Sequence, residues 1–221
     1  LFIAYHLPRQ QHSLIENRSF FVKANKPFAE VIESSLHGFL AQSWDAATLP
    51  LFGSLMTITT PERTLFGVVH QIQTGSMDPS RHPFAYKKTY EELRKEQPQI
   101  FEFLKTTFNA LVIGHTTASG KISYLLAPEP ARIHTFVCPS NVEMSVQFFK
   151  NTHYMHALFG LAHTVLNLDE LLLAMLAHQA SLGILSQEKL LDFTTTFSLL
   201  TGNDYRRLKL FLQRVEPILQ N

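Results

Sequence analysis

Two apolar segments, Phe52–Ile58 and Leu65–Ile72, flank a short polar stretch that contains Pro61. Both segments are rich in β-branched and aromatic residues and partly alternate apolar with polar positions, a pattern typical of a β-hairpin. Each also contains a glycine, Gly53 and Gly67, and glycine within a strand marks strong curvature because it has no Cβ atom. The sequence therefore predicts a tightly curved hairpin of the kind that builds a small barrel.

Further strand-like segments lie on both sides of this hairpin, each short and bounded by Gly, Pro, Ser or other polar residues. Together with the hairpin they make six or seven strands, enough to close a small barrel. Strands are predicted over Phe20–Ala24, Ala29–Ser34, Phe39–Trp44, Gly53–Ile58, Leu65–Ile72, Asn109–Thr116 and Lys121–Leu126.

One long segment interrupts the β pattern with charged and long side chains. We predict a helical insertion at about residues 76–106 that joins two barrel strands. Tyr86–Glu96 has a helical composition, and Pro98 breaks the helix before Ile100–Leu104. Insertions of this length often determine specificity, although a solvated helix that covers one barrel end explains the pattern equally well.

The sequence after Ser140 is leucine-rich with helical spacing, which predicts four or five helices in a bundle. Capping residues define three of these helices. Their predicted boundaries are, in chain order, Leu168–Glu170 to Gly183, Ser186–Glu188 to Gly202, and Asp204 to the last turn near Leu219.

These segments together predict an α+β fold, in which a small closed β-barrel of six or seven strands with a helical insertion is followed by a C-terminal α-helical bundle. The predicted domains are an N-terminal extension over residues 1–19, the barrel with its insertion over residues 20–138, and the helical domain over residues 139–221.

The charge balance excludes a general attraction to nucleic acid or to an anionic membrane, because 19 Lys and Arg face 18 Asp and Glu. No apolar run approaches the ~20 residues of a membrane-spanning helix. A single cysteine, Cys138, excludes an internal disulfide and favours a reducing compartment. We therefore expect a cytoplasmic location, or an organelle interior if a targeting segment precedes Leu1, where the chain starts without methionine.

The segment Gly114–Lys121 resembles a phosphate-binding loop, but its spacing differs from that motif. A Walker A loop has four residues between its glycines and a Ser or Thr after the lysine, whereas Ile122 follows the lysine here. The next residues predict a strand, so no helix N-terminus would hold a phosphate group. A hairpin turn is the predicted structure of this segment.

Three histidines, His153, His156 and His163, fall near one face of one predicted helix, as in some metal sites. No Asp or Glu lies between Met144 and Leu168, and the His-Glu-x-x-His motif is absent. We therefore expect no bound metal ion, and the sequence contains no motif that predicts a cofactor.

Alternation places His134, Phe136 and Cys138 on the same side of an extended segment, so a Cys–His pair for nucleophilic catalysis is conceivable. A small buried residue at a domain junction is the favoured interpretation of Cys138. The Gly-x-Ser-x-Gly motif of hydrolases is absent. We predict that the chain is not an enzyme, and a hydrolase that uses Cys138 and His134 stays open as an alternative.

Two groups of basic side chains are candidate interaction residues. Acidic residues interleave the first group, whereas the second group is denser. Basic residues on exposed helix faces are common, so contact with phosphate groups is the secondary interpretation. The candidates are Lys87, Lys88 and Arg94 in the insertion, and Arg206, Arg207 and Lys209 in the last helix.

Seven segments, taken in order, carry a resemblance to a known family. They are Val31–Ser35, Phe39–Gln42, Phe52–Met56, Thr64–Ile72, Gly75–Pro79, Glu96–Phe101 and Tyr124–Pro128. The region from about Ala29 to Cys138 resembles the standalone HAS-barrel proteins of bacteria, notably of cyanobacteria. Those proteins are related to the N-terminal barrels of HerA-type helicases and of rotary ATP synthase subunits.

This resemblance implies a non-catalytic barrel, because in the ATPase relatives the barrel forms a collar between subunits outside the motor domain. No Walker A loop follows the barrel here, so shared nucleotide chemistry is not expected. We expect an assembly module that docks on a larger complex, such as an oligomeric ATPase or a DNA-processing machine, through its barrel and bundle. The alternative is a nucleic-acid-binding protein whose barrel face uses Lys87, Lys88, Arg206 and Arg207.

Overall fold

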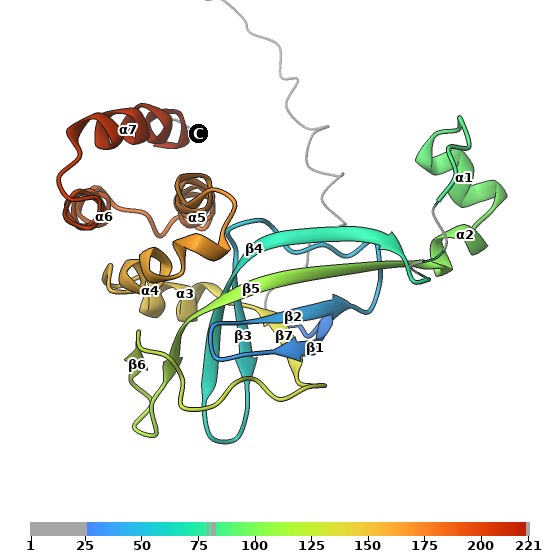
Figure 1. Cartoon of the computed structure of the whole chain (residues 1–221), viewed down its shortest axis with the longest axis horizontal. Helices are drawn as coiled ribbons and strands as arrows, with labels where there is room; N and C mark the ends of the chain where they lie inside the picture. Colours follow the sequence, from blue (N-terminus) through green and yellow to red (C-terminus); the bar gives the residue numbers. More distant parts are fainter. Residues whose placement is uncertain (1–25, 79, 81–82, 220–221) are drawn as a thin grey trace, which may run out of the picture.

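The computed structural model describes residues 26–78, 80 and 83–219 of the 221-residue chain. Its strands are β1 (Ala29–Ser34), β2 (Gly38–Ser43), β3 (Leu55–Thr59), β4 (Thr64–Ser76), β5 (Leu104–Thr116), β6 (Ile122–Ser123) and β7 (Phe136–Pro139). They form an antiparallel sheet in the order β2-β1-β7-β3-β4-β5-β6, and a further pairing of β2 with β5 closes six of them into a barrel (Figure 1). The strand β6 lies outside this closed ring. The predicted α+β barrel fold is therefore confirmed.

Six of the seven predicted segments contain strands, namely β1 to β6. The seventh, Phe20–Ala24, lies outside the described residues. The barrel is closed by β7, which the sequence did not identify as a strand and which pairs with β1 on one side and with β3 on the other. Because only two residues of β7 pair with each neighbour, this strand is too short to show a clear alternation in sequence.

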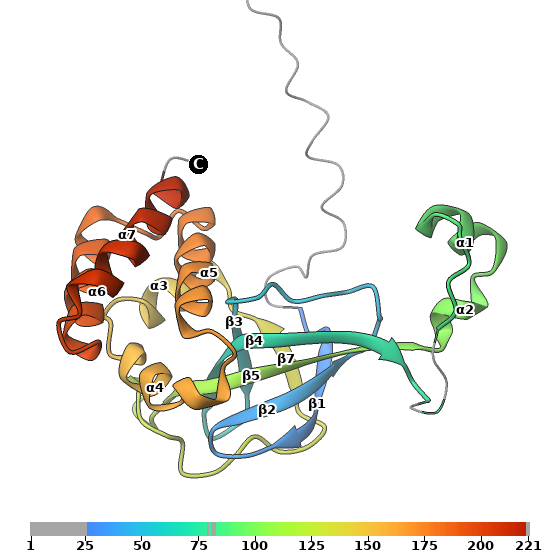
Figure 2. The same cartoon turned by 45° about the horizontal axis from the view of Figure 1, so that its top comes forward.

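The strands β4 and β5 are much longer than their neighbours, at 13 residues each. Pairing with β3 covers Thr64–Val68 of β4, and pairing with β2 covers Thr107–Leu111 of β5. Beyond these points the two strands remain paired with each other as far as Ser76 and Leu104. They therefore leave the barrel together as a two-stranded ribbon (Figures 1 and 2).

Two groups of helices lie at opposite ends of the molecule (Figures 1 and 2). The predicted insertion forms α1 (Tyr90–Glu96) and α2 (Gln99–Glu102) at the end of the ribbon. The second group is α3 (Val142–Phe148), α4 (Tyr154–Gly160), the 3₁₀ helix η2 (Ala162–Thr164), α5 (Leu168–Ser181), α6 (Gln187–Leu200) and α7 (Tyr205–Leu219). The described residues after 140 thus contain five α-helices, within the predicted range.

The predicted helix boundaries are confirmed by the capping residues. Ser186 caps α6 by accepting from the Lys189 N–H, and Asp204 accepts from the Arg207 N–H in the first turn of α7. Gly183 and Gly202 follow α5 and α6 with φ angles of +68° and +69°, a conformation that glycine adopts without strain. These capping residues therefore determine the helix ends through local contacts, as expected.

The barrel wall is buried on both faces along β3 and the first half of β4. Met56 and Ile58 belong to a cluster inside the barrel, whereas Leu55 belongs to a second cluster with the C-terminal helices. On β4, the side chains of Phe66 and Val68 join this second cluster. The helices therefore pack on one outer face of the barrel, which explains why β3 and the first half of β4 alternate only weakly between apolar and polar residues.

Both glycines of the predicted hairpin stand at close approaches. A Cβ atom on Gly67 would lie 2.7 Å from the Phe39 ring, which crosses the barrel interior. A Cβ atom on Gly53 would lie 2.6 Å from the Cβ of Ala174 in α5, and Gly53 has a φ angle of +78°. Gly67 therefore makes room inside the barrel, and Gly53 allows the barrel to approach α5.

Candidate interaction surface on the β4–β5 ribbon

The ribbon and the helices at its end form a projection that we call the arm, from Thr74 to Thr106. The helices α1 and α2, described in full, contain no buried residue. Figures 1 and 2 show them at a distance from the rest of the chain, at the end opposite α5 to α7. The helices of the arm therefore present their side chains to solvent rather than to the core.

Local sequence signals explain why α1 forms here. The Thr89 hydroxyl accepts from the Glu92 N–H at 3.3 Å, and the Thr89 N–H donates to Glu92 Oε2 at 2.8 Å, which completes a capping box. These hydrogen bonds, first the one from the Thr89 backbone, lower the pKa of Glu92. The helix ends at Gln97, directly before Pro98, as the sequence predicted.

A few contacts within the arm hold its helices together. The rings of Tyr90 and Phe101 meet edge to face at 5.0 Å, and the Arg94 guanidinium lies 6.0 Å from the centre of the Tyr90 ring. An ion pair joins Lys88 to Glu96. These contacts are local and partly exposed, so the described residues of the arm form no hydrophobic core of their own.

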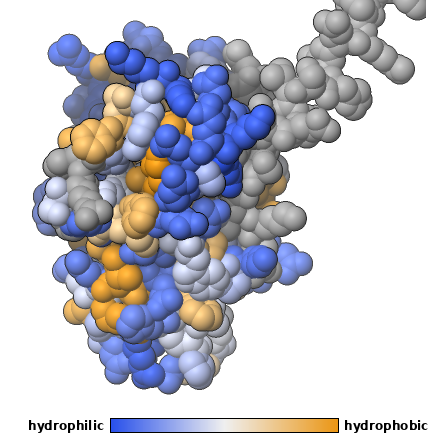
Figure 3. Space-filling view, turned by 90° about the vertical axis from the view of Figure 1, so that its right-hand side faces the viewer, coloured by the Kyte–Doolittle hydropathy of each residue, from blue (hydrophilic) through white to orange (hydrophobic). Residues whose placement is uncertain are grey.

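Large apolar side chains are exposed on the arm. Phe84 is 81% exposed and Phe103 is 61% exposed, and the other exposed members of this group are Met77, Tyr86 and Tyr90. Figure 3 views the molecule from this end and shows apolar residues gathered among polar ones on the surface. Exposed apolar groups that gather on a projection are typical of protein interaction surfaces.

Three of the six candidate basic residues lie on the arm, and two of them have partners there. Lys88 pairs with Glu96, and Arg94 packs over Tyr90. Lys87 has a left-handed backbone conformation with a φ angle of +55°. These charges were predicted from the sequence, whereas the exposed Phe84 and Phe103 were not, although aromatic residues in a charged segment without apolar periodicity indicate such exposure.

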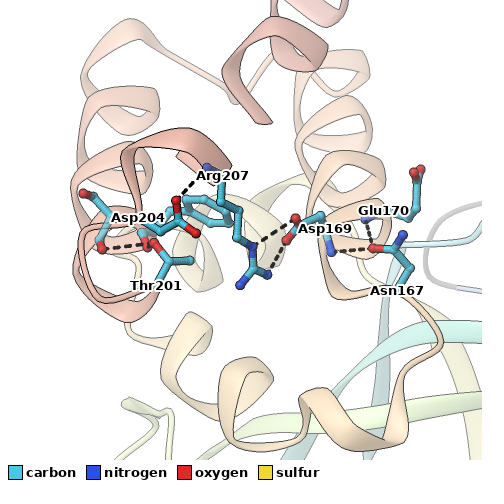
Figure 4. Close-up of polar contacts among 8 residues, drawn as sticks. Asn167, Asp169, Glu170, Thr201, Asp204 and Arg207 are labelled. Carbon is cyan, nitrogen blue, oxygen red and sulfur yellow. Dashed lines mark hydrogen bonds and ion pairs between the residues drawn. The ribbon is translucent and has the colours of Figure 1, made fainter. Parts of the chain in front are cut away.

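The other three candidates lie on α7, and Arg207 binds within the protein. Its Nη2 and Nε atoms donate to the two carboxylate oxygens of Asp169 in α5, at 2.6 Å and 3.1 Å (Figure 4). The guanidinium also lies over the rings of Phe159 and Phe197. The hydrogen bond to Asp169 is the main reason why the pKa of Arg207 is raised. Arg207 therefore connects helices, whereas Arg206 and Lys209 are exposed on the helix surface.

The two groups of candidates do not share one surface. Lys87, Lys88 and Arg94 lie at the end of the arm, and Arg206, Arg207 and Lys209 lie on α7 at the other end of the molecule (Figures 1 and 2). A single basic face that combines both groups is therefore absent from the described part of the chain.

The structure does not support the pair of Cys138 and His134 that was considered from the sequence. His134 lies in a turn with a φ angle of +68°, and its ring contacts the Glu30 carboxylate in β1. Cys138 lies in β7, where its backbone pairs with Thr57 of β3. Burial raises the pKa of the Cys138 thiol, which disfavours the reactive thiolate.

The prediction of one helix for the three histidines is wrong. His153 precedes α4 and His156 lies within it, whereas α4 ends at Gly160 and His163 belongs to η2. Within residues 26–78, 80 and 83–219, no group of three His, Cys, Asp or Glu side chains could hold a metal ion.

The segment between β5 and β6 forms a hairpin turn, as predicted. The Thr117 N–H donates to the Lys121 carbonyl at 2.8 Å, and Gly120 has a φ angle of +76°. A strand follows this turn, so the turn does not open a helix that could bind phosphate.

An open hollow of about 230 Å³ contains polar side chains that the sequence analysis did not consider together. His37, His70 and Asn109 line it, from the β1–β2 turn, β4 and β5. Burial lowers the pKa of His70, so its imidazole is neutral at pH 7. These residues lie far apart in the sequence, so no local motif could reveal the hollow.

A scan against protein-family models and a search of the curated proteins find no match for this chain. The closed barrel agrees in general form with the expected HAS-barrel architecture, but a six-stranded barrel is a general fold and does not identify that family. Among the described residues, no helix has the length and apolar character needed to span a membrane.

Proposed function

We propose that the chain is a non-catalytic interaction module that docks on a larger protein assembly through its arm. The observation that carries this proposal is the exposure of Phe84 and Phe103 beside helices that bury no residue of their own. The arm also contains Tyr86, Tyr90 and Arg94, and Tyr and Arg are the residue types that dominate binding at protein interfaces.

Aromatic side chains that stay exposed to water lose the free energy that their burial would contribute. Burial of one Phe side chain contributes about 1.5–3 kcal/mol, and the arm forgoes this contribution at Phe84 and Phe103. A partner with an apolar pocket would bury these side chains and so provide this free energy on binding. The proposed partner therefore offers apolar pockets to these two side chains.

The charge of the arm favours a protein over a nucleic acid. Between Thr74 and Thr106 the sequence has six Lys or Arg and five Asp or Glu, so the arm is nearly neutral. Nucleic-acid binding depends on an excess of positive charge that neutralises phosphates. Since Lys88 also has an acidic partner, the alternative of a nucleic-acid-binding barrel has weaker support.

The proposed class of partner comes from the sequence. The resemblance to barrels that form collars on ATPases makes an oligomeric ATPase or a DNA-processing machine the class of assembly that we propose. The exposed arm is compatible with this class, because a projection can reach a neighbouring subunit while the barrel keeps its own packing.

The test is affinity capture from the native lysate, with nuclease treatment and a high-salt wash. We expect a stoichiometric protein partner that survives nuclease and that the Phe84→Ser/Phe103→Ser variant loses, with at least about tenfold weaker binding. The matched control is Leu191→Ser/Leu199→Ser, which removes two apolar side chains of comparable exposure from α6.

Two results would contradict the proposal. Capture that disappears after nuclease treatment would favour the nucleic-acid alternative. Equal loss of the partner in the arm variant and in the α6 control would show that the arm has no special role in docking.

A further inference from the structure

The helix α7 has a second, partly apolar stripe, of which Leu212 is half-buried and Tyr205 and Leu219 are exposed. Phe211 and Val215 are buried against the helical core. A separate groove of about 400 Å³ runs between α6 and α7, and Leu190 of α6 forms part of its wall. On the α7 side, Tyr205 is 74% exposed and Leu219 is 51% exposed.

The residues of α7 along this groove follow a regular spacing. Tyr205, Lys209, Leu212, Glu216 and Leu219 are separated by four, three, four and three positions, so they form one continuous stripe along the helix. A helix that packs on a globular core needs only one apolar stripe. This second stripe is therefore available to a partner helix.

The order of residues in the stripe is self-complementary when it is reversed. An antiparallel copy centred on Leu212 places Tyr205 opposite Leu219 and Leu212 opposite Leu212, and it brings Lys209 within one residue of the level of Glu216, about 1.5 Å along the helix axis. Apolar residues then face apolar residues, and each of two lysines faces a glutamate. A parallel copy would instead place lysine opposite lysine and glutamate opposite glutamate, which is unfavourable.

We propose that two copies of this chain form a dimer in which their α7 helices pair antiparallel across a two-fold axis near Leu212. Tyr205, Leu212 and Leu219 supply the apolar contact, and the two Lys209–Glu216 pairs select the antiparallel orientation. Figure 1 shows α7 on the far side of the helical group from the barrel and the arm. The proposal does not depend on the proposed function of the arm.

The charge pairs provide a sharp test. Lys209→Glu places two glutamates opposite two glutamates across the axis, and Glu216→Lys places two lysines opposite two lysines. The double variant Lys209→Glu/Glu216→Lys restores opposite charges with the same composition as the wild type. An equimolar mixture of the two single variants also restores them, but only in a dimer that contains one chain of each kind.

The measurement is sedimentation equilibrium of the full chain over a range of concentrations at low salt, with circular dichroism to verify the fold of each variant. We expect the wild type, the double variant and the mixture to dimerise. Each single variant alone should dimerise at least about tenfold more weakly, because two attractions become two repulsions.

Three results would overturn the proposal. The first is a wild-type chain that stays monomeric at all concentrations, and the second is a dimer that the single variants do not weaken. The third is a mixture of the single variants that stays monomeric, which would exclude the antiparallel pairing. None of these results concerns the arm, so a failure of the proposed dimer can be distinguished from a failure of the proposed function.

Discussion

Arg207 connects four helices through one side chain. It extends from α7, forms two hydrogen bonds with Asp169 of α5, and packs over Phe159 of α4 and Phe197 of α6. Arg214 on the same helix pairs with Glu170 of α5 at 2.6 Å, but both members of that pair are more exposed. The two arginines therefore form similar ion pairs in different environments.

We predict that Arg207→Ala lowers the free energy of unfolding by about 1–2 kcal/mol, because it removes two charge-assisted hydrogen bonds and the packing on two rings. Arg214→Ala is the matched control and should cost less than about 1 kcal/mol, as exposed pairs usually do. Urea denaturation of both variants provides the comparison. Equal effects would contradict the distinction between the two pairs.

The pH dependence of stability should reflect His178 in α5. Burial lowers the pKa of His178 below its value in the unfolded chain, so the unfolded chain binds a proton more readily. Stability should therefore be complete above a pH of about 6.5 and should fall as the pH decreases below it. His178→Gln should reduce this loss between about pH 7.5 and pH 5.5, where most carboxylates remain ionised.

The control for this prediction is His163→Gln, which changes an exposed histidine. The measurement is the free energy of unfolding in urea at each pH. A pH dependence that is unchanged in His178→Gln but reduced in His163→Gln would contradict the assignment to His178.

At the scale of elements, the barrel parts of β4 and β5 were predictable from the sequence, whereas their extensions into the arm were not. The apolar alternation of Leu65–Ile72 and Asn109–Thr116 predicted the barrel parts of β4 and β5. The strands continue as far as Ser76 and Leu104 without that alternation, supported by cross-strand contacts such as the 2.7 Å hydrogen bond between the Thr74 and Thr106 hydroxyls. Such pairing depends on a distant partner strand, so a local pattern cannot reveal it.

The dependence on distant contacts also explains why the exposed aromatic residues of the arm were not predicted from the sequence. The helical insertion was predicted from its charged and long side chains and from Pro98, and the capping box of Thr89 and Glu92 acts within four residues. Whether Phe84 and Phe103 are buried depends on how the whole insertion packs, which the sequence does not specify. The helix break at Gly160 had no proline to mark it, so the three histidines were wrongly assigned to one helix.

We predict that the arm can be shortened without loss of the fold. Replacing residues 77–103 with Asn-Gly joins Ser76 to Leu104, which already face each other in the ladder, through a two-residue hairpin turn. Because α1 and α2 bury no residue, the free energy of unfolding should change by less than about 1 kcal/mol. Thermal and urea denaturation measure this, and a chain that fails to fold would show that the arm supports the barrel.

At the scale of the whole molecule, the arm and α7 lie at opposite ends, with the barrel and the other helices between them (Figure 2). One end presents aromatic side chains for the proposed partner, and the other presents the self-complementary stripe. A dimer formed through α7 would therefore carry two free arms. Such a dimer could bind two sites of one assembly, and this raises the apparent affinity without any new contact.

This arrangement predicts that the two ends act independently. The chain with the shortened arm should dimerise with the same dissociation constant as the wild type, because the arm contributes no residue to the stripe along α7. Conversely, Lys209→Glu should leave the affinity of a single arm for its partner unchanged in solution. The dissociation of the Lys209→Glu variant from a surface that carries many partner copies should be faster than that of the wild type, since a monomer lacks the second arm.

Sedimentation equilibrium measures the dimerisation of the shortened chain, and surface binding at low and high partner density measures the dissociation of the Lys209→Glu variant. Weaker dimerisation of the shortened chain would show that the arm takes part in the dimer, and equal dissociation at high density would contradict the two-armed dimer.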